Sequence, residues 1–153
     1  HESFARLRLD ATILAGDAAN PDRWWDGRAF DRIVIDAPCS ASGVIRRYPD
    51  IKHLRRAGDL PVLAARQQQL LRALWPLVAE GGCLLFATCS IFRAENGAVV
   101  QEFTRDTANV RLDNQLRDGN ISGVMRAEPY GLSMLPGTQE ADGFFISRLW
   151  REP

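Results

Sequence analysis

Residues 83–90 read CLLFATCS, and this stretch indicates the centre of a β-sheet. Its first five residues form a continuous apolar run, which is typical of a central strand covered on both faces. Thr88-Cys89-Ser90 follows where that strand should end. An upstream stretch repeats the arrangement, since RIVID at 32–36 has the pattern of a buried strand and leads into Ala37-Pro38-Cys39-Ser40. The chain therefore carries two predicted strands that are each followed by a cysteine.

Helical patterns separate and follow these two strands. Asp59 with Pro61 signals a helix start, and apolar residues keep a helical period until Gly81-Gly82, with Pro76 expected to bend the last turn. A second helix is predicted over 94–103. Further strands are expected at 11–15 (ATILA), 110–112 and 144–150. Strands that alternate with helices predict an α/β domain with a mostly parallel sheet.

Polar and thiol side chains stand just past the ends of the predicted strands. In α/β sheets, ligands sit beyond the carboxyl ends of the strands. We therefore expect Asp17, Asp36, Cys39 and Cys89 to line one edge of the sheet, with Cys83 buried elsewhere. Thiolate chemistry fits there, because nearby helix N-termini lower the pKa of a thiol. Two structural alternatives stay open: the cysteines are small buried hydrophobes, and the carboxylates cap a following helix or turn.

The composition limits the classes of protein to which this chain could belong. The chain has 153 residues, of which 46% are hydrophobic and 25% charged, as in one ordinary globular domain. No apolar run approaches the roughly 20 residues of a membrane helix, so a soluble, cytoplasmic protein is predicted. The three cysteines have no C-x-x-C spacing, which favours free thiols over a disulfide framework or a metal site.

Basic residues cluster directly after Cys39. The formal net charge of zero argues against nucleic-acid binding by bulk electrostatics, so any phosphate binding must be local. The local cluster consists of Arg46, Arg47, Lys52, Arg55 and Arg56, with Tyr48 and His53 interleaved. The cluster predicts contacts with RNA phosphates beside the site, and a solvated helical face is the alternative.

Three strings carry a family resemblance: DAPCSASGVIRRYPDIKHLRR (36–56), GGCLLFATCSIFRAEN (81–96), and LPG (135–137) followed by DGFF (142–145). They resemble the bacterial ribosomal RNA cytosine-5 methyltransferases of the Sun/Fmu (NOL1/NOP2/Sun) family, from about Gly16 onward. The pair Pro38-Cys39 and Thr88-Cys89 is the most specific element. The resemblance implies a Rossmann-like S-adenosylmethionine-dependent methyltransferase fold.

The part of that fold which normally holds the cofactor is not found in the sequence. No strand with a glycine-rich turn stands before Asp10. The fold is therefore expected to be incomplete at the N-terminus, with the first strands and the glycine-rich loop missing. Residues 1–153 are then expected to be the C-terminal part of a methyltransferase catalytic domain.

The resemblance also implies roles for individual residues. Cys89 would attack C6 of a cytosine in RNA, Asp36 would lie against the base and the methionine end of the cofactor, and Cys39 would assist release. Asp17 would contact the adenine of the cofactor. The implied cofactor is S-adenosyl-L-methionine, and the implied partner is RNA, ribosomal RNA in particular, with no membrane and no metal. Glu95-Asn96 and the DGFF string match the family without an assigned role.

Two other functions remain as alternatives. The first is a truncated, catalytically inactive α/β module that retains RNA or partner binding. The second is a different cysteine chemistry, such as that of a thiol hydrolase or redox protein. It ranks last, because it needs a partner histidine or a C-x-x-C pair, and the chain offers only His1 and His53.

Overall fold

The computed structural model describes residues 2–113 and 124–153. The helices and strands of this part are α1 (Glu2–Leu7), β1 (Phe30–Asp36), α2 (Ile51–Leu54), α3 (Asp59–Leu74), β2 (Val78–Thr88), α4 (Gly97–Asp106), β3 (Val110–Leu112), β4 (Arg126–Glu128), β5 (Gly131–Met134) and β6 (Phe144–Arg151). Short 3-10 helices lie at Pro21–Arg23, Ser42–Val44, Trp75–Leu77, Arg93–Glu95 and Thr138–Glu140. No helix of the described residues is long and apolar enough to cross a membrane.

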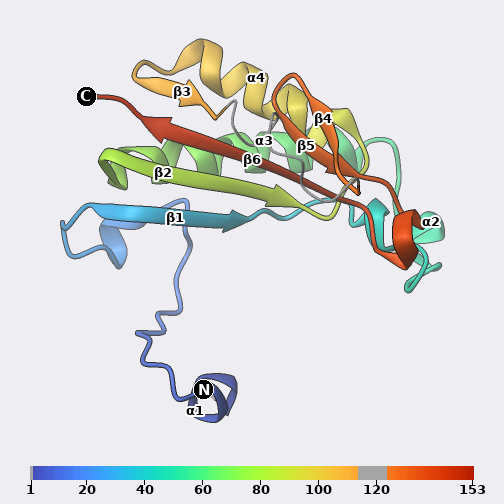
Figure 1. Ribbon diagram of the computed structural model, residues 1–153, viewed down its shortest axis with the longest axis horizontal. Coiled ribbons are helices and arrows are strands. Elements are labelled where there is room, and N and C mark those ends of the chain that lie inside the picture. Colours follow the sequence, from blue (N-terminus) through green and yellow to red (C-terminus); the bar gives the residue numbers. More distant parts are fainter. Residues whose placement is uncertain (1, 114–123) are drawn as a thin grey trace.

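The strands form one sheet in the order β1-β2-β6-β5-β4, and β3 also pairs with β6 (Figure 1). Only β1 and β2 are parallel among the described pairings, whereas β2–β6, β3–β6, β4–β5 and β5–β6 are antiparallel. The prediction of a mostly parallel sheet is therefore wrong for this part of the chain. Short connections join β4, β5 and β6, and such connections join antiparallel strands, whereas parallel strands need a long crossover.

The long helix and the central strand follow the sequence pattern, with shifted boundaries. α3 begins at Asp59 as predicted but ends at Leu74, well before Gly81-Gly82. Pro76 lies in the following 3-10 turn, because proline cannot continue an α-helix. β2 contains the predicted strand 83–87, and the side chains of Leu84 and Phe86 are fully buried. The central position of this strand is confirmed.

α3 and α4 cover one face of the sheet (Figure 1). α4 starts later than predicted, but its residues Val99, Val100 and Phe103 are buried as expected. Phe103 meets Trp75 edge-to-face, with ring centroids 5.6 Å apart. These side chains pack against Phe86 and other residues of the central strands. The core thus fixes both helices against the central strands.

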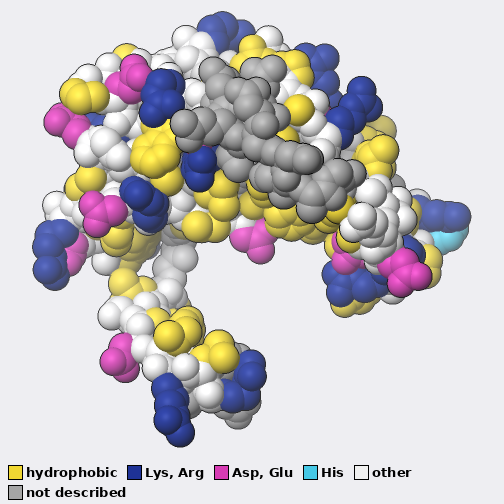
Figure 2. Space-filling view, in the orientation of Figure 1, with side chains coloured by type: hydrophobic (Ala, Val, Ile, Leu, Met, Phe, Trp, Pro, Cys, Tyr) yellow, Lys and Arg dark blue, Asp and Glu magenta, His cyan; other side chains and the backbone are white. Residues whose placement is uncertain are grey.

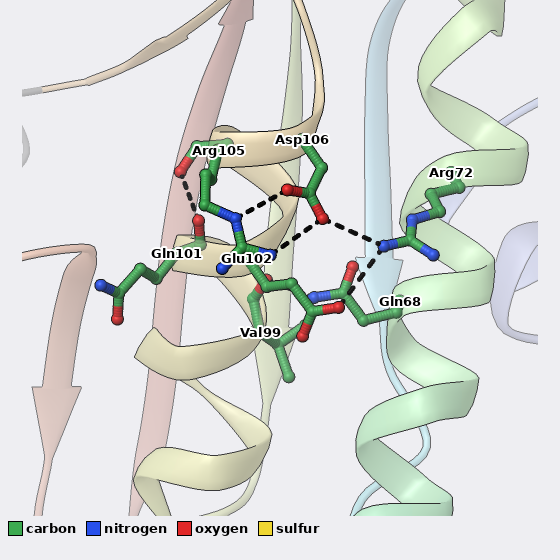
Figure 3. A network of polar contacts seen from close by, with 8 residues as sticks. Gln68, Arg72, Val99, Gln101, Glu102, Arg105 and Asp106 are labelled. Atoms are coloured by element: carbon green, nitrogen blue, oxygen red, sulfur yellow. Dashed lines mark hydrogen bonds and ion pairs between the residues drawn. The ribbon is translucent and has the colours of Figure 1, made fainter.

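One buried hydrogen bond and two surface ion pairs join the two helices (Figure 3). The Gln68 amide donates to the Val99 carbonyl oxygen over 2.6 Å. The Arg72 guanidinium lies 3.4 Å from Glu102 and 3.6 Å from Asp106. Exposed ion pairs of this kind contribute little stability, so apolar packing holds the helices together.

The N-terminal side of the sheet departs from prediction. No strand forms at 11–15, where Ile13 and Leu14 are 49% and 62% exposed. β1 is not the buried strand that was expected, because Val34 is 68% exposed and no described strand pairs with its outer edge. An apolar run becomes a buried strand only where a neighbour supplies hydrogen bonds and a covering surface. α1 and the segment that directly follows it instead extend away from the sheet (Figures 1 and 2).

Candidate active site

The carboxyl ends of β1 and β2 bring two thiols together. Parallel pairing sets Asp36 opposite Ala87, so the loops that carry Cys39 and Cys89 leave the sheet side by side. The two Sγ atoms are 3.4 Å apart, and both side chains are partly exposed. Cys83 lies buried within β2. The predicted convergence of Cys39 and Cys89, apart from Cys83, is confirmed.

A buried carboxylate ties the two cysteine loops to each other. Glu95 is fully buried, and its Oε1 accepts a hydrogen bond of 2.7 Å from the Ser40 backbone N–H. Its Oε2 accepts a hydrogen bond of 2.6 Å from Ser90 Oγ. Ser40 and Ser90 directly follow the two cysteines, so one side chain sets the spacing of both loops. Sequence reasoning missed this role, although the match of Glu95 to a family motif was the available signal.

Hydroxyl groups complete the buried network around Glu95. The Oγ atoms of Ser40, Ser42 and Ser90 lie 3.1–3.3 Å from one another. Thr88 Oγ1 donates to Asn96 Oδ1 over 2.5 Å, and Asn96 Nδ2 donates to the Ser90 carbonyl over 2.8 Å. Buried polar groups with partners of this kind specify one arrangement, since an unpaired group costs about 1–3 kcal/mol.

Two glycines allow three backbone segments to meet beneath the thiols. Gly43 N–H donates to the Cys89 carbonyl, and Gly143 N–H donates to the Gly43 carbonyl, each over 2.8 Å. A Cβ atom at Gly43 would lie 2.2 Å from the Gly143 carbonyl oxygen, and one at Gly143 would lie 2.9 Å from Gly43 Cα. Gly143 belongs to the DGFF string, which gives that string a structural role.

We expect Gly43→Ala to destabilise the fold by about 2–4 kcal/mol, because the added methyl group meets backbone atoms that cannot move independently. The measurement is the free energy of unfolding in denaturant. Gly58→Ala is the matched control, since its Cβ would meet nothing within 4 Å and its φ is −68°. Equal stability of the two variants would contradict the close approach.

The two predicted carboxylates lie in different surroundings. Asp36 is exposed at the end of β1, and within the described residues its carboxylate has no hydrogen-bond or ion-pair partner. Asp17 accepts hydrogen bonds from the Ala19 backbone N–H (3.0 Å), Asn20 (2.7 Å) and Arg66 (2.6 Å). The Ala19 hydrogen bond, followed by those of Arg66 and Asn20, lowers the pKa of Asp17.

Asp17 therefore holds a turn, as the structural alternative proposed, and it does not follow a strand. Its partner Arg66 lies on α3 and is next in sequence to Gln67. The Gln67 amide donates to the Pro38 carbonyl over 2.9 Å. One helix thus contacts both the Asp17 turn and the Cys39 loop.

The Cys39 thiol is held in its neutral form. Burial, and to a smaller extent the adjacent Cys89 thiol, together raise the pKa of Cys39 from 9.0 to about 12, against a lowering by the backbone N–H of Ala41. The thiolate is the nucleophilic form of cysteine. At neutral pH, Cys39 is consequently suited to hold a proton rather than to attack carbon.

We expect Cys39 to be alkylated by iodoacetamide far more slowly than an ordinary thiol at pH 8, by roughly three orders of magnitude, because its thiolate fraction is small. Its labelling rate should keep rising with pH through 10 instead of levelling off near 9. Mass spectrometry of the Cys39 peptide after timed labelling measures this. A plateau near pH 9 would show that the thiol has an ordinary pKa.

The five predicted RNA-binding cations divide into two groups. Arg46 donates to the Glu140 carbonyl over 2.5 Å, and Arg47 forms an ion pair with Asp142. Lys52, Arg55 and Arg56 instead line a pocket of about 360 Å³ that also contacts Ser40. All five are exposed, and the Lys and Arg side chains around α2 lie at one end of the molecule, beside carboxylates (Figure 2). The alternative interpretation was that this cluster is a solvated helical face. The α-helix in this segment, α2, is only a single turn.

The alternative of a thiol hydrolase or redox protein finds no support in the described residues. His53 is exposed, and no hydrogen bond links it to either thiol, while His1 lies outside the described residues. No group of three or more His, Cys, Asp or Glu side chains that could hold a metal ion occurs in residues 2–113 and 124–153.

Comparisons with known proteins agree on one family. Residues 1–150 match the family described as 16S rRNA methyltransferase RsmB/F. The chain is 44% identical over 151 residues to ribosomal RNA small subunit methyltransferase B of Vibrio vulnificus, covering 99% of this chain and 33% of that protein. The chain thus spans about a third of the length of such relatives.

Solved structures share the fold. The crystal structure of PH0851 superposes with a TM-score of 0.82 and 25% identity, over 98% of this chain and 33% of that one. NSun6 from Pyrococcus horikoshii, determined with SFG, superposes with a TM-score of 0.79 and 24% identity, over 99% of this chain and 38% of that one. The observed sheet with its covering helices is therefore a Rossmann-like methyltransferase fold, of which this chain holds a part.

Proposed function

Because the chain belongs to the 16S rRNA methyltransferase RsmB/F family, we propose that it transfers a methyl group from S-adenosylmethionine to C5 of a cytosine in RNA. In this proposal residues 1–153 are the C-terminal part of the catalytic domain, and ribosomal RNA in the cytoplasm is the substrate. The observation that carries the proposal is the 3.4 Å approach of Cys39 and Cys89 at the ends of two parallel strands. A C5 methylation needs two proton-handling or nucleophilic groups at one base, and this pair provides them.

The two thiols would divide the work. The Cys89 thiolate forms a bond to C6 of the base, and the electron pair moves into the ring so that C5 becomes nucleophilic. Bound S-adenosylmethionine supplies the methyl group. Release then requires loss of the C5 proton and return of the electron pair to the Cys89 sulfur. Cys39, protonated because its pKa is raised, would donate its proton to the departing Cys89 sulfur, while water at the partly exposed site would accept the C5 proton.

The carboxylates suit the proposed cofactor. The methionine end of S-adenosylmethionine carries a positive sulfonium and an ammonium group, and the exposed Asp36 carboxylate, free of partners in the described residues, is complementary to them. Asp36 would also face the base. In Asp17, Oδ1 accepts two hydrogen bonds and Oδ2 accepts one, so Oδ2 keeps a free lone pair for the adenine amino group.

RNA would lie across the basic cluster. Arg46, Arg47, Lys52, Arg55 and Arg56 would contact phosphates, since Arg and Lys dominate such contacts. The target base must leave any stack to reach thiols at a sheet edge, so an RNA loop fits better than a duplex.

One observation favours the inactive module as a second candidate. β1 has no described neighbour on its outer edge, and the chain spans about a third of the length of its relatives, so a module that retains RNA binding without methyl transfer is the second candidate. The full-length gene product is therefore the material for the test.

We expect the full-length gene product to release tritium from small-subunit ribosomal RNA that carries 5-tritiated cytidine, in step with methyl incorporation. Methylation at C5 displaces the C5 hydrogen, whereas methylation at a nitrogen or at the 2′-hydroxyl leaves it in place. Scintillation counting of the solvent, with and without S-adenosylmethionine, measures the release. Methyl incorporation without tritium release would exclude C5 chemistry, and neither signal would favour the inactive module.

A further inference from the structure

A pocket lies beside the thiols without containing them. Its volume is about 360 Å³, and its walls come from both cysteine loops. Ser40 directly follows Cys39, and Phe92 stands three residues after Cys89. The Phe92 backbone N–H donates to Ser90 Oγ over 3.1 Å, which joins this aromatic residue to the network that positions Cys89. The pocket is therefore lined by residues of the same two loops that carry the thiols.

The lining of the pocket combines an apolar interior with cations. Ile45, Ile51 and Leu60 supply apolar surface, and the Phe92 ring is 42% exposed. The cations are Lys52, Arg55 and Arg56, against the single carboxylate of Asp59, which already accepts the Arg56 backbone N–H over 3.0 Å. The lining is thus net positive.

One of these cations is fixed in place. Arg55 Nε donates to the Ser40 carbonyl over 2.9 Å, which uses one of the five N–H donors of the guanidinium. The side chains of Lys52 and Arg56 have no hydrogen-bond or ion-pair partner among the described residues. Cations without protein partners beside apolar and aromatic surface match a ligand that has a flat ring and a phosphate.

We propose that this pocket binds the nucleotide next to the target cytosine, with its base against Phe92 and its phosphate at Lys52 and Arg56. The inference rests on the proposed function and adds a second base site to it. The volume is at the small end of the range for ligand pockets, which suits one nucleotide. Base stacking on an aromatic ring tolerates any base, so the pocket adds affinity and positioning rather than sequence readout.

The test is a double-mutant cycle that combines removal of the Phe92 ring with removal of single RNA bases. Single-stranded RNAs that contain the target cytosine carry one abasic nucleotide at each neighbouring position in turn. Kd is measured by fluorescence anisotropy and kcat/KM by methyl transfer, using the full-length gene product and its Phe92→Ala variant. At one neighbouring position, we expect base removal to weaken binding roughly tenfold in the wild type and to have no further effect in Phe92→Ala.

Controls separate the base site from general charge. Ile91→Ala is matched, because Ile91 is 43% exposed in the same loop but does not line the pocket, and the abasic effect should persist in it. Arg56→Ala should reduce the slope of log Kd against log salt by about 0.7, whereas the remote Arg28→Ala should leave it unchanged.

The outcomes distinguish this inference from the proposed function. Methylation without any position coupled to Phe92 would overturn the base site and leave the C5 reaction standing. Coupling in Kd without methylation would support the base site and contradict the reaction. No difference in Kd among the intact and abasic RNAs would overturn the base site directly.

Discussion

Cys89→Ala in the full-length gene product is expected to abolish methylation and any covalent protein–RNA complex. Cys39 is then a poor substitute nucleophile, because burial, the largest cause of its raised pKa, remains when Cys89 is removed. We expect a loss of at least about 10⁴-fold in kcat, as for other enzymes that lose their nucleophile. Methyl incorporation and a denaturing gel measure the two effects.

Cys39→Ala is expected to behave differently. The attack by Cys89 remains possible while release is impaired, so a covalent protein–RNA complex should accumulate as a slow band on the denaturing gel. Cys83→Ala is the matched control, because Cys83 is buried in β2 away from both loops and should form no such band. A complex that persists in Cys89→Ala and is lost in Cys39→Ala would exchange the two roles.

Glu95→Ala is expected to have the next largest effect. It removes the acceptor of the Ser40 N–H and the Ser90 hydroxyl and leaves a cavity in the buried network. Hydrogen bonds to a charged group contribute about 1.5–3 kcal/mol each, so we expect a loss of about 3 kcal/mol or more of unfolding free energy. Displacement of either loop by an ångström would also lower kcat about a hundredfold.

Glu95→Gln is the conservative companion of that variant. The amide oxygen still accepts the Ser40 N–H, and its NH2 group can donate to Ser90 Oγ if that hydroxyl reverses. Most of the stability and part of kcat should therefore return. Glu102→Gln, at a half-exposed ion pair on α4, serves as the surface control and should change stability by under about 0.5 kcal/mol. Equal effects of Glu95→Ala and Glu102→Gln would contradict the bridging role.

The sequence predicted elements whose signals are local. The strand at 83–87 and the helix from Asp59 were predicted correctly, because an apolar run and a helical period are both patterns of residues close together in the sequence. The pair of cysteines was placed correctly by a rule about strand ends. The prediction of a strand at 11–15 was wrong. A strand needs a neighbouring strand to pair with, and the sequence of one segment does not show whether such a neighbour is present.

The parts of the site that sequence reasoning missed depend on contacts between distant segments. Glu95 bonds Ser40 across 55 positions, and Gly43 meets Gly143 across about a hundred. A glutamate before a helix is ordinary in sequence, and only burial shows that it is shared by two loops. The sequence likewise does not show that Arg46 and Arg47 bind Glu140 and Asp142 within the protein, which separates them from the other three cations.

The outer edge of β1, where no described strand pairs, has a practical consequence for handling the 153-residue chain. A row of free backbone N–H and C=O groups is a template for another strand, and the exposed Val34 and Phe30 add apolar surface beside it. Two copies can meet along that edge and continue the sheet from one molecule into the next. We therefore expect concentrated samples of the bare chain to self-associate, and we expect a covered β1 edge to reduce that association.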